Sequence, residues 1–217
     1  MKQRWTAFQI CLLVVISSSI FAQELKPILL PTPQMQGGMP LMQALKNRRS
    51  QRRFSSEKLP LQTLSNLLWA ANGINRPELK KRTAPSARNA QEIDVYVVME
   101  EGVYRYDAVS NLLQPILKGD HRAATGTQPF VKNAPVNLVF VADWTKIPVA
   151  SEEEKKVYAA TDVGYISQNV YLFCASEELA TVARGMVDGV SLATRMGLPP
   201  DQRVILTQTV GHPEKPQ

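Results

Sequence analysis

One stretch of this sequence concentrates residues that could bind a phosphate. KNRRSQRRFSS, at positions 46–56, holds five basic residues and no acid. Guanidinium groups form paired N–H bonds to phosphate oxygens, so Arg48, Arg49 and the hydroxyl of Ser50 could grip one phosphate monoester. Two other interpretations remain open. The stretch ends a predicted helix, where arginines also offset the helix dipole as solvated surface, or it could be a patch for a polyanion.

A second stretch places polar side chains directly before a strand. RTAPSARNAQEIDVYVVM, at positions 82–99, contains the pattern Pro-Ser-x-x-Asn-x-Gln, which is Pro85, Ser86, Asn89 and Gln91. Such residues can line a ligand, or they can simply cap the loop that leads into the strand. From the residues alone both interpretations remain open.

Common catalytic motifs are missing from this chain. The sequence has two histidines and two cysteines, and it contains no H-E-x-x-H, C-x-x-C or G-x-S-x-G motif and no glycine-rich phosphate loop. We therefore expect no metal site and no side-chain nucleophile, and any catalysis would depend on a bound cofactor.

The first 22 residues are typical of a secretory signal peptide. Lys2 and Arg4 precede an apolar run from Ala7 to Ile16, and small residues end at Ala22. Cleavage there would leave a periplasmic or secreted protein of a bacterial envelope, without a stable membrane anchor. It would also leave Cys174 as the one cysteine, so no internal disulfide can form. The formal charge of +6 would fall to about +4, which does not indicate nucleic-acid binding.

The rest of the chain predicts one α+β domain behind an extended arm. Residues 23–40 are rich in Pro, Gly and Gln and predict the arm, and residues 41–217 form the domain. Apolar periodicity and alternation predict helices over 40–49, 60–73, 151–179 and 188–198, and strands over 93–99, 103–107, 136–143 and 203–211. Ser151 and Glu154 form a capping box at the start of the long helix. Gly164 in the middle of that helix suggests close approach of another backbone.

Four segments together resemble the nitroreductase family of FMN flavoproteins. They are RRSQRRF, PSARNAQ, GYISQNVYLFCASEELATVARGMVD and MGLPPDQRVILTQTVGHP, and the likeness covers residues 41–213. It is closest to the branch that contains the azoline-oxidising (thiazole- and oxazole-forming) dehydrogenases. The resemblance implies a central, mostly antiparallel sheet flanked by helices, and a homodimer with FMN at its interface. It also implies that hydride is relayed through flavin N5. NAD(P)H would be the electron donor to the flavin, and a small organic molecule would be the substrate.

The resemblance assigns site residues by position. Arg48, Arg49 and Ser50 would hold the FMN phosphate and ribityl chain, and Arg52 would face the pyrimidine edge of the flavin. The other residues would line the ring or bring a backbone N–H near N5: Pro85, Ser86, Asn89, Gln91, Arg184 and Gly185. The chain departs from the family at its end, GHPEKPQ, where only Lys215 could complete the phosphate site, and at Glu177–Glu178, where the family usually has Gly-Leu.

Two competing functions remain at this stage. One is an exported flavin- or small-anion-binding protein of the same fold without turnover. The other is a basic envelope protein whose arginines contact anionic lipid or polymer.

Overall fold

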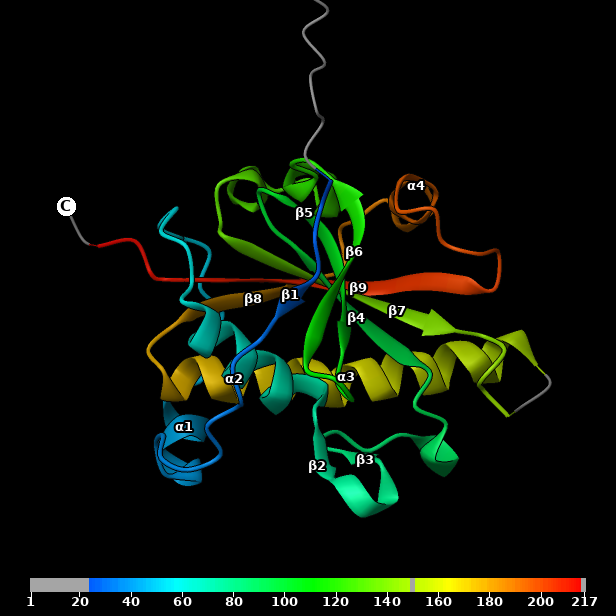
Figure 1. Ribbon diagram of the computed structural model, residues 1–217, viewed down its shortest axis with the longest axis horizontal. Helices are drawn as coiled ribbons and strands as arrows, with labels where there is room; N and C mark the ends of the chain where they lie inside the picture. The colour runs from blue at the N-terminus through cyan, green and yellow to red at the C-terminus, as the bar shows by residue number, and fades with distance from the viewer. Residues whose placement is uncertain (1–23, 149–150, 216–217) are drawn as a thin grey trace, which may run out of the picture.

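The computed structural model describes residues 24–148 and 151–215. The predicted signal peptide, residues 1–22, lies outside this range. A seven-stranded sheet crosses the molecule in the order β1-β6-β5-β4-β7-β9-β8, and every neighbouring pair is antiparallel (Figure 1). The strands are β1 (Ile28–Leu29), β4 (Ile93–Val98), β5 (Gly102–Asp107), β6 (Leu112–Lys118), β7 (Val136–Asp143), β8 (Ala180–Arg184) and β9 (Gln202–Gly211). The predicted α+β class and antiparallel sheet are confirmed.

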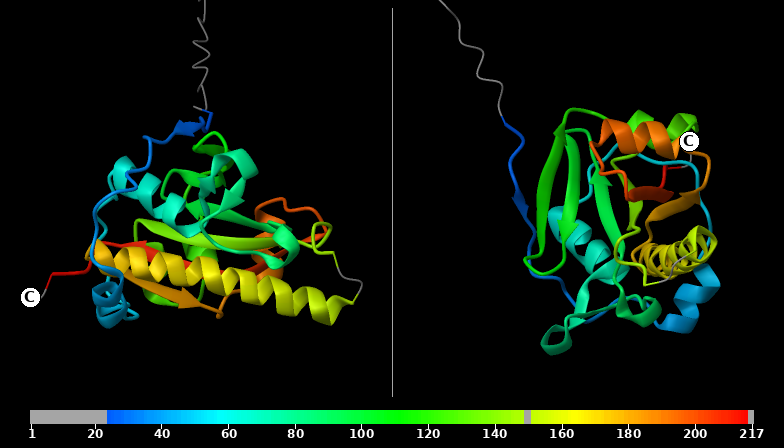
Figure 2. Two further views of the ribbon diagram at one scale, coloured as in Figure 1. Left: turned by 90° about the horizontal axis from the view of Figure 1, so that it is seen from below. Right: turned by 90° about the vertical axis from the view of Figure 1, so that its right-hand side faces the viewer.

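Helices cover both faces of this sheet. They are α1 (Leu41–Asn47), α2 (Leu61–Asn72), α3 (Glu152–Ser176) and α4 (Gly189–Arg195). The second view in Figure 2 shows α3 below the strands and α4 above them. Four 3-10 turns, η1 (Pro77–Leu79), η2 (Ala87–Asn89), η3 (Arg122–Thr125) and η4 (Pro129–Lys132), and a small hairpin of β2 (Ile74–Arg76) and β3 (Lys81–Arg82) complete the described part.

The core forms where alternating side chains of the central strands meet the helices. Val95, Leu138 and Phe140 pack on the α2 and α3 side, and Val139 and Val141 pack toward α4. Strand β7 is therefore buried on both faces, as its apolar run predicts. On the larger side the strands meet the apolar stripe of α2.

The long helix begins as predicted and ends earlier than predicted. The Oγ of Ser151 accepts the backbone N–H of Glu154 at 3.1 Å, which confirms the N-cap. The helix stops at Ser176, not 179, because Glu178 takes a left-handed conformation (φ 56°) and Leu179 N–H donates to Cys174 O at 2.8 Å. This is a Schellman motif with glutamate at the left-handed position that glycine usually occupies. Because that glycine is missing, the sequence does not show where the helix ends. Residues 180–184 then form β8, which we did not predict.

Gly164 is exposed, and no other described backbone segment of the same chain approaches it closely. No described atom outside its own helix lies within 4 Å of where its Cβ would be. The close approach expected at Gly164 is therefore absent within this subunit.

The predicted N-terminal arm is extended, but it is also packed against the domain. β1 pairs with β6, and Leu30 of the arm is only 4% exposed in the core. The carbonyl of Pro31 accepts bonds from Ser65 Oγ (2.5 Å) and Asn111 Nδ2 (2.8 Å). The arm therefore connects β6 to α2 through these hydrogen bonds before the chain continues into α1.

Candidate functional site

The basic stretch lies along an edge of the sheet, between α1 and β8. Gln51 N–H donates to Thr181 O of β8 at 2.9 Å, so the stretch covers the open side of that edge strand. Tyr171, near the end of α3, accepts the Ala183 N–H at 2.9 Å and shares a 2.8 Å hydroxyl bond with Ser50. Its ring also lies 5.3 Å from the Arg48 guanidinium carbon, a cation–π contact. Tyr171, which the sequence analysis did not single out, thus joins the basic stretch to the sheet.

Arg48 and Arg49 line a cavity of about 820 Å³ beside this edge. Lys215, from the far end of the chain, lines the same cavity, as does Lys46. The tertiary structure therefore adds the C-terminal cation that the sequence left in doubt. Two carboxylates, those of Glu178 and Glu214, also line the cavity, so its charge is mixed with the cations in excess. A phosphate monoester, with oxygens that accept several N–H bonds, fits this donor set.

Ser50 and Arg52 have different surroundings from the two arginines. The Ser50 hydroxyl is engaged by Tyr171 at the rim. Arg52 and Arg53 are exposed and are not among the residues that line the cavity. The structure therefore brings Arg48 and Arg49 to one cavity and leaves Arg52 outside its lining.

The loop that holds the second predicted group lies elsewhere along α3. Pro85 and Asn89 are exposed. The Ser86 Oγ accepts the Gln91 N–H at 3.0 Å, and the Gln91 side chain bonds Arg82 Nε (2.9 Å), Lys80 O (2.9 Å) and Asn89 Oδ1 (3.2 Å). The Ser86 oxygen therefore accepts a bond within the loop, and the Gln91 amide holds the loop to β3. A ligand contact by either residue stays a prediction.

The two groups are separated within one subunit. The loop is anchored at Asp162 of α3, through Ala87 N–H at 3.1 Å, whereas the basic stretch is anchored at Tyr171. Nine residues of helix span about 13 Å. Figure 1 shows the same separation, with α1 beneath the C-terminal end of α3 and the β2–β3 hairpin beneath its middle.

Arg184 is buried, whereas its neighbour Gly185 is exposed. The Arg184 guanidinium bonds Thr125 O (2.8 Å) and Asn137 Oδ1 (3.0 Å), and burial lowers its pKa to about 10. Its side chain therefore supports the core, and the expected role of this position, a backbone N–H near N5 together with Gly185, stays a prediction. Gly185, at the exposed end of β8, has open space where a Cβ would stand. Its backbone remains accessible to a ligand.

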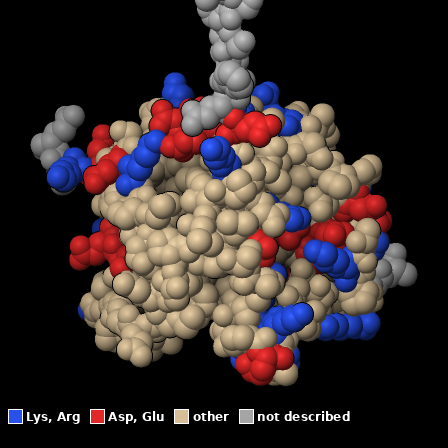
Figure 3. Space-filling view, in the orientation of Figure 1, with Lys and Arg blue, Asp and Glu red and all other residues tan. Residues whose placement is uncertain are grey.

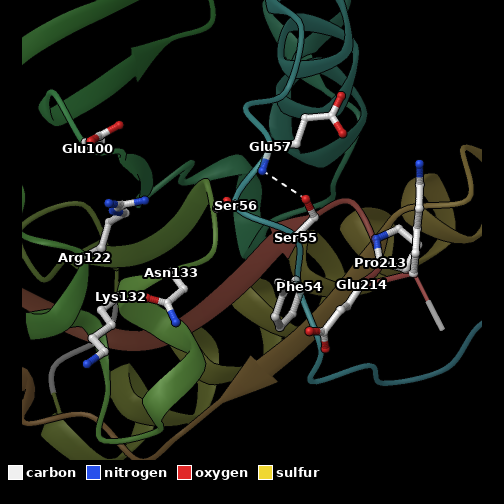
Figure 4. A pocket seen from close by; sticks show the side chains of 11 residues that line it. Phe54, Ser55, Ser56, Glu57, Glu100, Arg122, Lys132, Asn133, Pro213 and Glu214 are labelled. Carbon is white, nitrogen blue, oxygen red and sulfur yellow. Dashed lines mark hydrogen bonds between the residues drawn. The ribbon is translucent and has the colours of Figure 1, made fainter. Parts of the chain in front are cut away.

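A larger hollow of about 930 Å³ lies on the other side of the C-terminal segment. Figure 4 shows Phe54, Ser55 and Glu57 on one side of it and Arg122, Lys132 and Asn133 on the other. Arg122 is already paired with Asp120 at 2.8 Å. Because its charges are mixed and partly neutralised in this way, the hollow is a weaker phosphate site than the cavity at Arg48.

Comparisons with known proteins agree on one family. The model of the family described as "Nitroreductase family" matches residues 45–212. The protein named "Putative nitroreductase MJ1384", from Methanocaldococcus jannaschii, is 33% identical over 155 residues, which cover 67% of this chain and 78% of that protein. A crystal structure from Ralstonia eutropha JMP134, described as that of a "putative nitroreductase", is 42% identical with a TM-score of 0.83, covering 88% of this chain and 90% of the other. A Desulfovibrio desulfuricans structure, described as that of a "putative nitroreductase in complex with fmn", shares the fold at 22% identity, with a TM-score of 0.60 and coverage of 82% of this chain and 89% of the other.

Proposed function

Because the chain belongs to the nitroreductase family, a family of flavin-dependent oxidoreductases, we propose that it is an exported FMN-dependent oxidoreductase. The observation that carries this proposal is the cavity that Arg48, Arg49 and Lys215 line together. The FMN phosphate would bind there, and the isoalloxazine ring would lie toward the exposed end of β8 at Gly185.

FMN, when bound, supplies two-electron transfer through its N5 atom. The chain's own residues would hold and tune that group. Tyr171 fixes the position of Arg48 and Ser50 at the phosphate end. Arg52 would face the pyrimidine edge, where a positive charge favours the anionic, reduced flavin. Gly185 would offer a backbone N–H without a side chain that blocks approach.

We propose a homodimer in which the FMN site lies between the two subunits, as the family resemblance implies. Within one chain, the anchor of the loop carrying Pro85 and Asn89 lies about 13 Å along α3 from the anchor of the basic stretch that would hold the ligand. A second subunit could bring its own loop to that ligand. Figure 3 shows a broad area over α1 and α2 with few charged side chains, and Leu41, Met42 and Leu45 of α1 are exposed. Tyr165, beside Gly164 on α3, is also 46% exposed, as expected of a contact face.

The substrate would be a small organic molecule that stacks on the ring. The resemblance to the azoline-oxidising branch suggests a thiazoline or oxazoline, and an electron-poor nitro compound is the alternative class. NAD(P)H is the electron donor that the family resemblance suggests, although an exported enzyme would need a donor available in the envelope.

The competing function is a flavin-binding protein of the same fold without turnover. Purified protein loaded with FMN would be mixed with NADH or dithionite and then with a nitroarene or an azoline, while flavin absorbance is followed. Reoxidation that depends on substrate supports the oxidoreductase. Bound flavin without such turnover supports the binding protein, and absence of flavin binding would overturn both.

We also propose that the protein is exported. N-terminal sequencing of the protein recovered from its host is expected to find Gln23 or a neighbour as the first residue. Soluble protein that retains Met1 would contradict export. In the part of the chain that the structure describes, no helix is both long enough and apolar enough to cross a membrane.

A further inference from the structure

The loop that carries Pro85 to Gln91 is held in a strained shape. Arg88, Asn89 and Gln91 all have left-handed backbone conformations, with φ of 53°, 57° and 49°. Residues other than glycine and, to a smaller degree, asparagine avoid this region because Cβ crowds the backbone, so the strain falls mainly on Arg88 and Gln91. Such a loop keeps its shape only when its surroundings hold it.

Two buried carboxyl groups adjoin this loop, one on α3 and one at the C-terminal end of the loop. Asp162 of α3 is 2% exposed, and its Oδ2 accepts the Ala87 N–H of the loop at 3.1 Å. Glu92, the residue that ends the loop, is 1% exposed, and neither oxygen of its carboxyl group accepts a hydrogen bond from any described residue. A carboxylate at Glu92 would therefore be buried without a donor, which is costly.

A proton on Glu92 removes this difficulty. The protonated carboxyl can donate to the neighbouring carboxylate of Asp162. Burial raises the pKa of Glu92 most, its own backbone N–H opposes the rise, and the hydrogen bond and the charge of Asp162 add to it, which brings the pKa to about 7. The charged groups that act on Glu92 are Asp162 of α3 and Lys146, after β7, which opposes the rise. Two adjacent buried carboxyls cannot both ionise readily.

We propose that Glu92 holds a proton, which it donates in a hydrogen bond to Asp162, and that these two side chains together position the 85–91 loop. The protonated Glu92 donates to Asp162, and Asp162 in turn holds Ala87. When the proton is lost, two negative charges face each other beside the strained loop, and the loop opens. That this loop borders the flavin rests on the proposed function, but the positioning itself does not.

The direction of the pH effect follows from the two states of the loop. In the closed loop Glu92 keeps its proton up to a pH of about 7, whereas in the open loop it ionises near its ordinary value of 4.5. Opening therefore becomes easier by as much as about tenfold per pH unit between these values, and it levels off above pH 7.

Hydrogen exchange of the Ala87 backbone amide in the flavin-free protein tests the pair. Exchange would be followed from pH 5 to 8 and corrected for the intrinsic rate. The parent should lose roughly 40-fold in protection between pH 5 and 7. Glu92→Gln, whose amide donates to Asp162 but does not titrate, should show no such fall. Glu153→Gln, the same change at an exposed position of α3, should follow the parent.

A further variant tests the role of Asp162. Asp162→Asn keeps an oxygen for Ala87 N–H but removes the charge, so the fall in protection should end at a lower pH than in the parent. Three results would each refute the proposed role of Glu92 and Asp162. They are a parent whose protection does not change with pH, a Glu92→Gln variant that follows the parent, and an Asp162→Asn variant whose fall in protection ends at the same pH as in the parent. Circular dichroism confirms that each variant is folded. Because no flavin is present, failure here leaves the proposed function untouched, and FMN titration tests that function separately.

Discussion

Arg49→Ala removes an exposed guanidinium from the proposed phosphate cavity, and within the chain this guanidinium bonds the side-chain oxygen of the neighbouring Gln51 at 3.2 Å. Arg48 is a poorer choice, since its guanidinium also stacks on Tyr171 and its loss would disturb the edge of β8. A hydrogen bond to a charged group contributes about 1.5–3 kcal/mol. The lower end applies to Arg49, because water screens an exposed charge and Glu178 and Glu214 line the same cavity. FMN affinity should therefore fall about tenfold.

Riboflavin separates the phosphate contact from every other effect of the substitution. It lacks the phosphate, so Arg49→Ala should leave its dissociation constant nearly unchanged. Both ligands would be titrated at fixed ionic strength while flavin fluorescence is followed. Added salt should narrow the difference between parent and variant for FMN, because ions screen the phosphate contact.

Arg53→Ala is the matched control, since Arg53 is equally exposed on the same stretch but does not line the cavity. It should change FMN affinity by less than about twofold. If Arg49→Ala and Arg53→Ala weaken FMN equally, the stretch is only a solvated basic surface. A parallel loss of riboflavin in Arg49→Ala would instead show that the substitution damages the fold of the site, and it would refute the phosphate assignment.

Three further predictions concern the framework of the site. Tyr171→Phe removes the acceptor of the Ala183 N–H and the partner of Ser50, and it should lower the free energy of unfolding by about 1–3 kcal/mol; an unchanged urea midpoint would show that water replaces the hydroxyl. Leu30→Ala should cost about 2–5 kcal/mol by the same measurement, because the arm buries this side chain in the core; a loss below about 0.5 kcal/mol would mean that the arm is dispensable. Tyr165→Arg should convert a homodimer to monomers in light scattering, and a parent that is monomeric with bound flavin at micromolar concentration would contradict the dimer.

Several features of this protein were predictable because they depend on neighbours in the sequence. The apolar run of β7, the hairpin of β4 and β5 and the N-cap at Ser151 are local patterns, and all were found where predicted. The nitroreductase fold was expected because four short segments, in order, resemble that family, and the antiparallel sheet confirms it. Strand β8 was not predicted, because the helix before it ends at a glutamate in the left-handed conformation and no glycine marks that end in the sequence.

The site, in contrast, depends on which distant residues the fold brings together. Lys215 joins Arg48 only because β9 carries the end of the chain back beside α1. Arg49 lines a cavity, whereas Arg184 supports the core, and no pattern in the neighbouring sequence distinguishes these two arginines. Glu92 likewise looks like an ordinary surface residue until α3 places Asp162 against it. Charge and polarity are properties of a residue, but burial and partners are properties of the tertiary structure, and these decide whether a charge binds a ligand, supports a core or holds a proton.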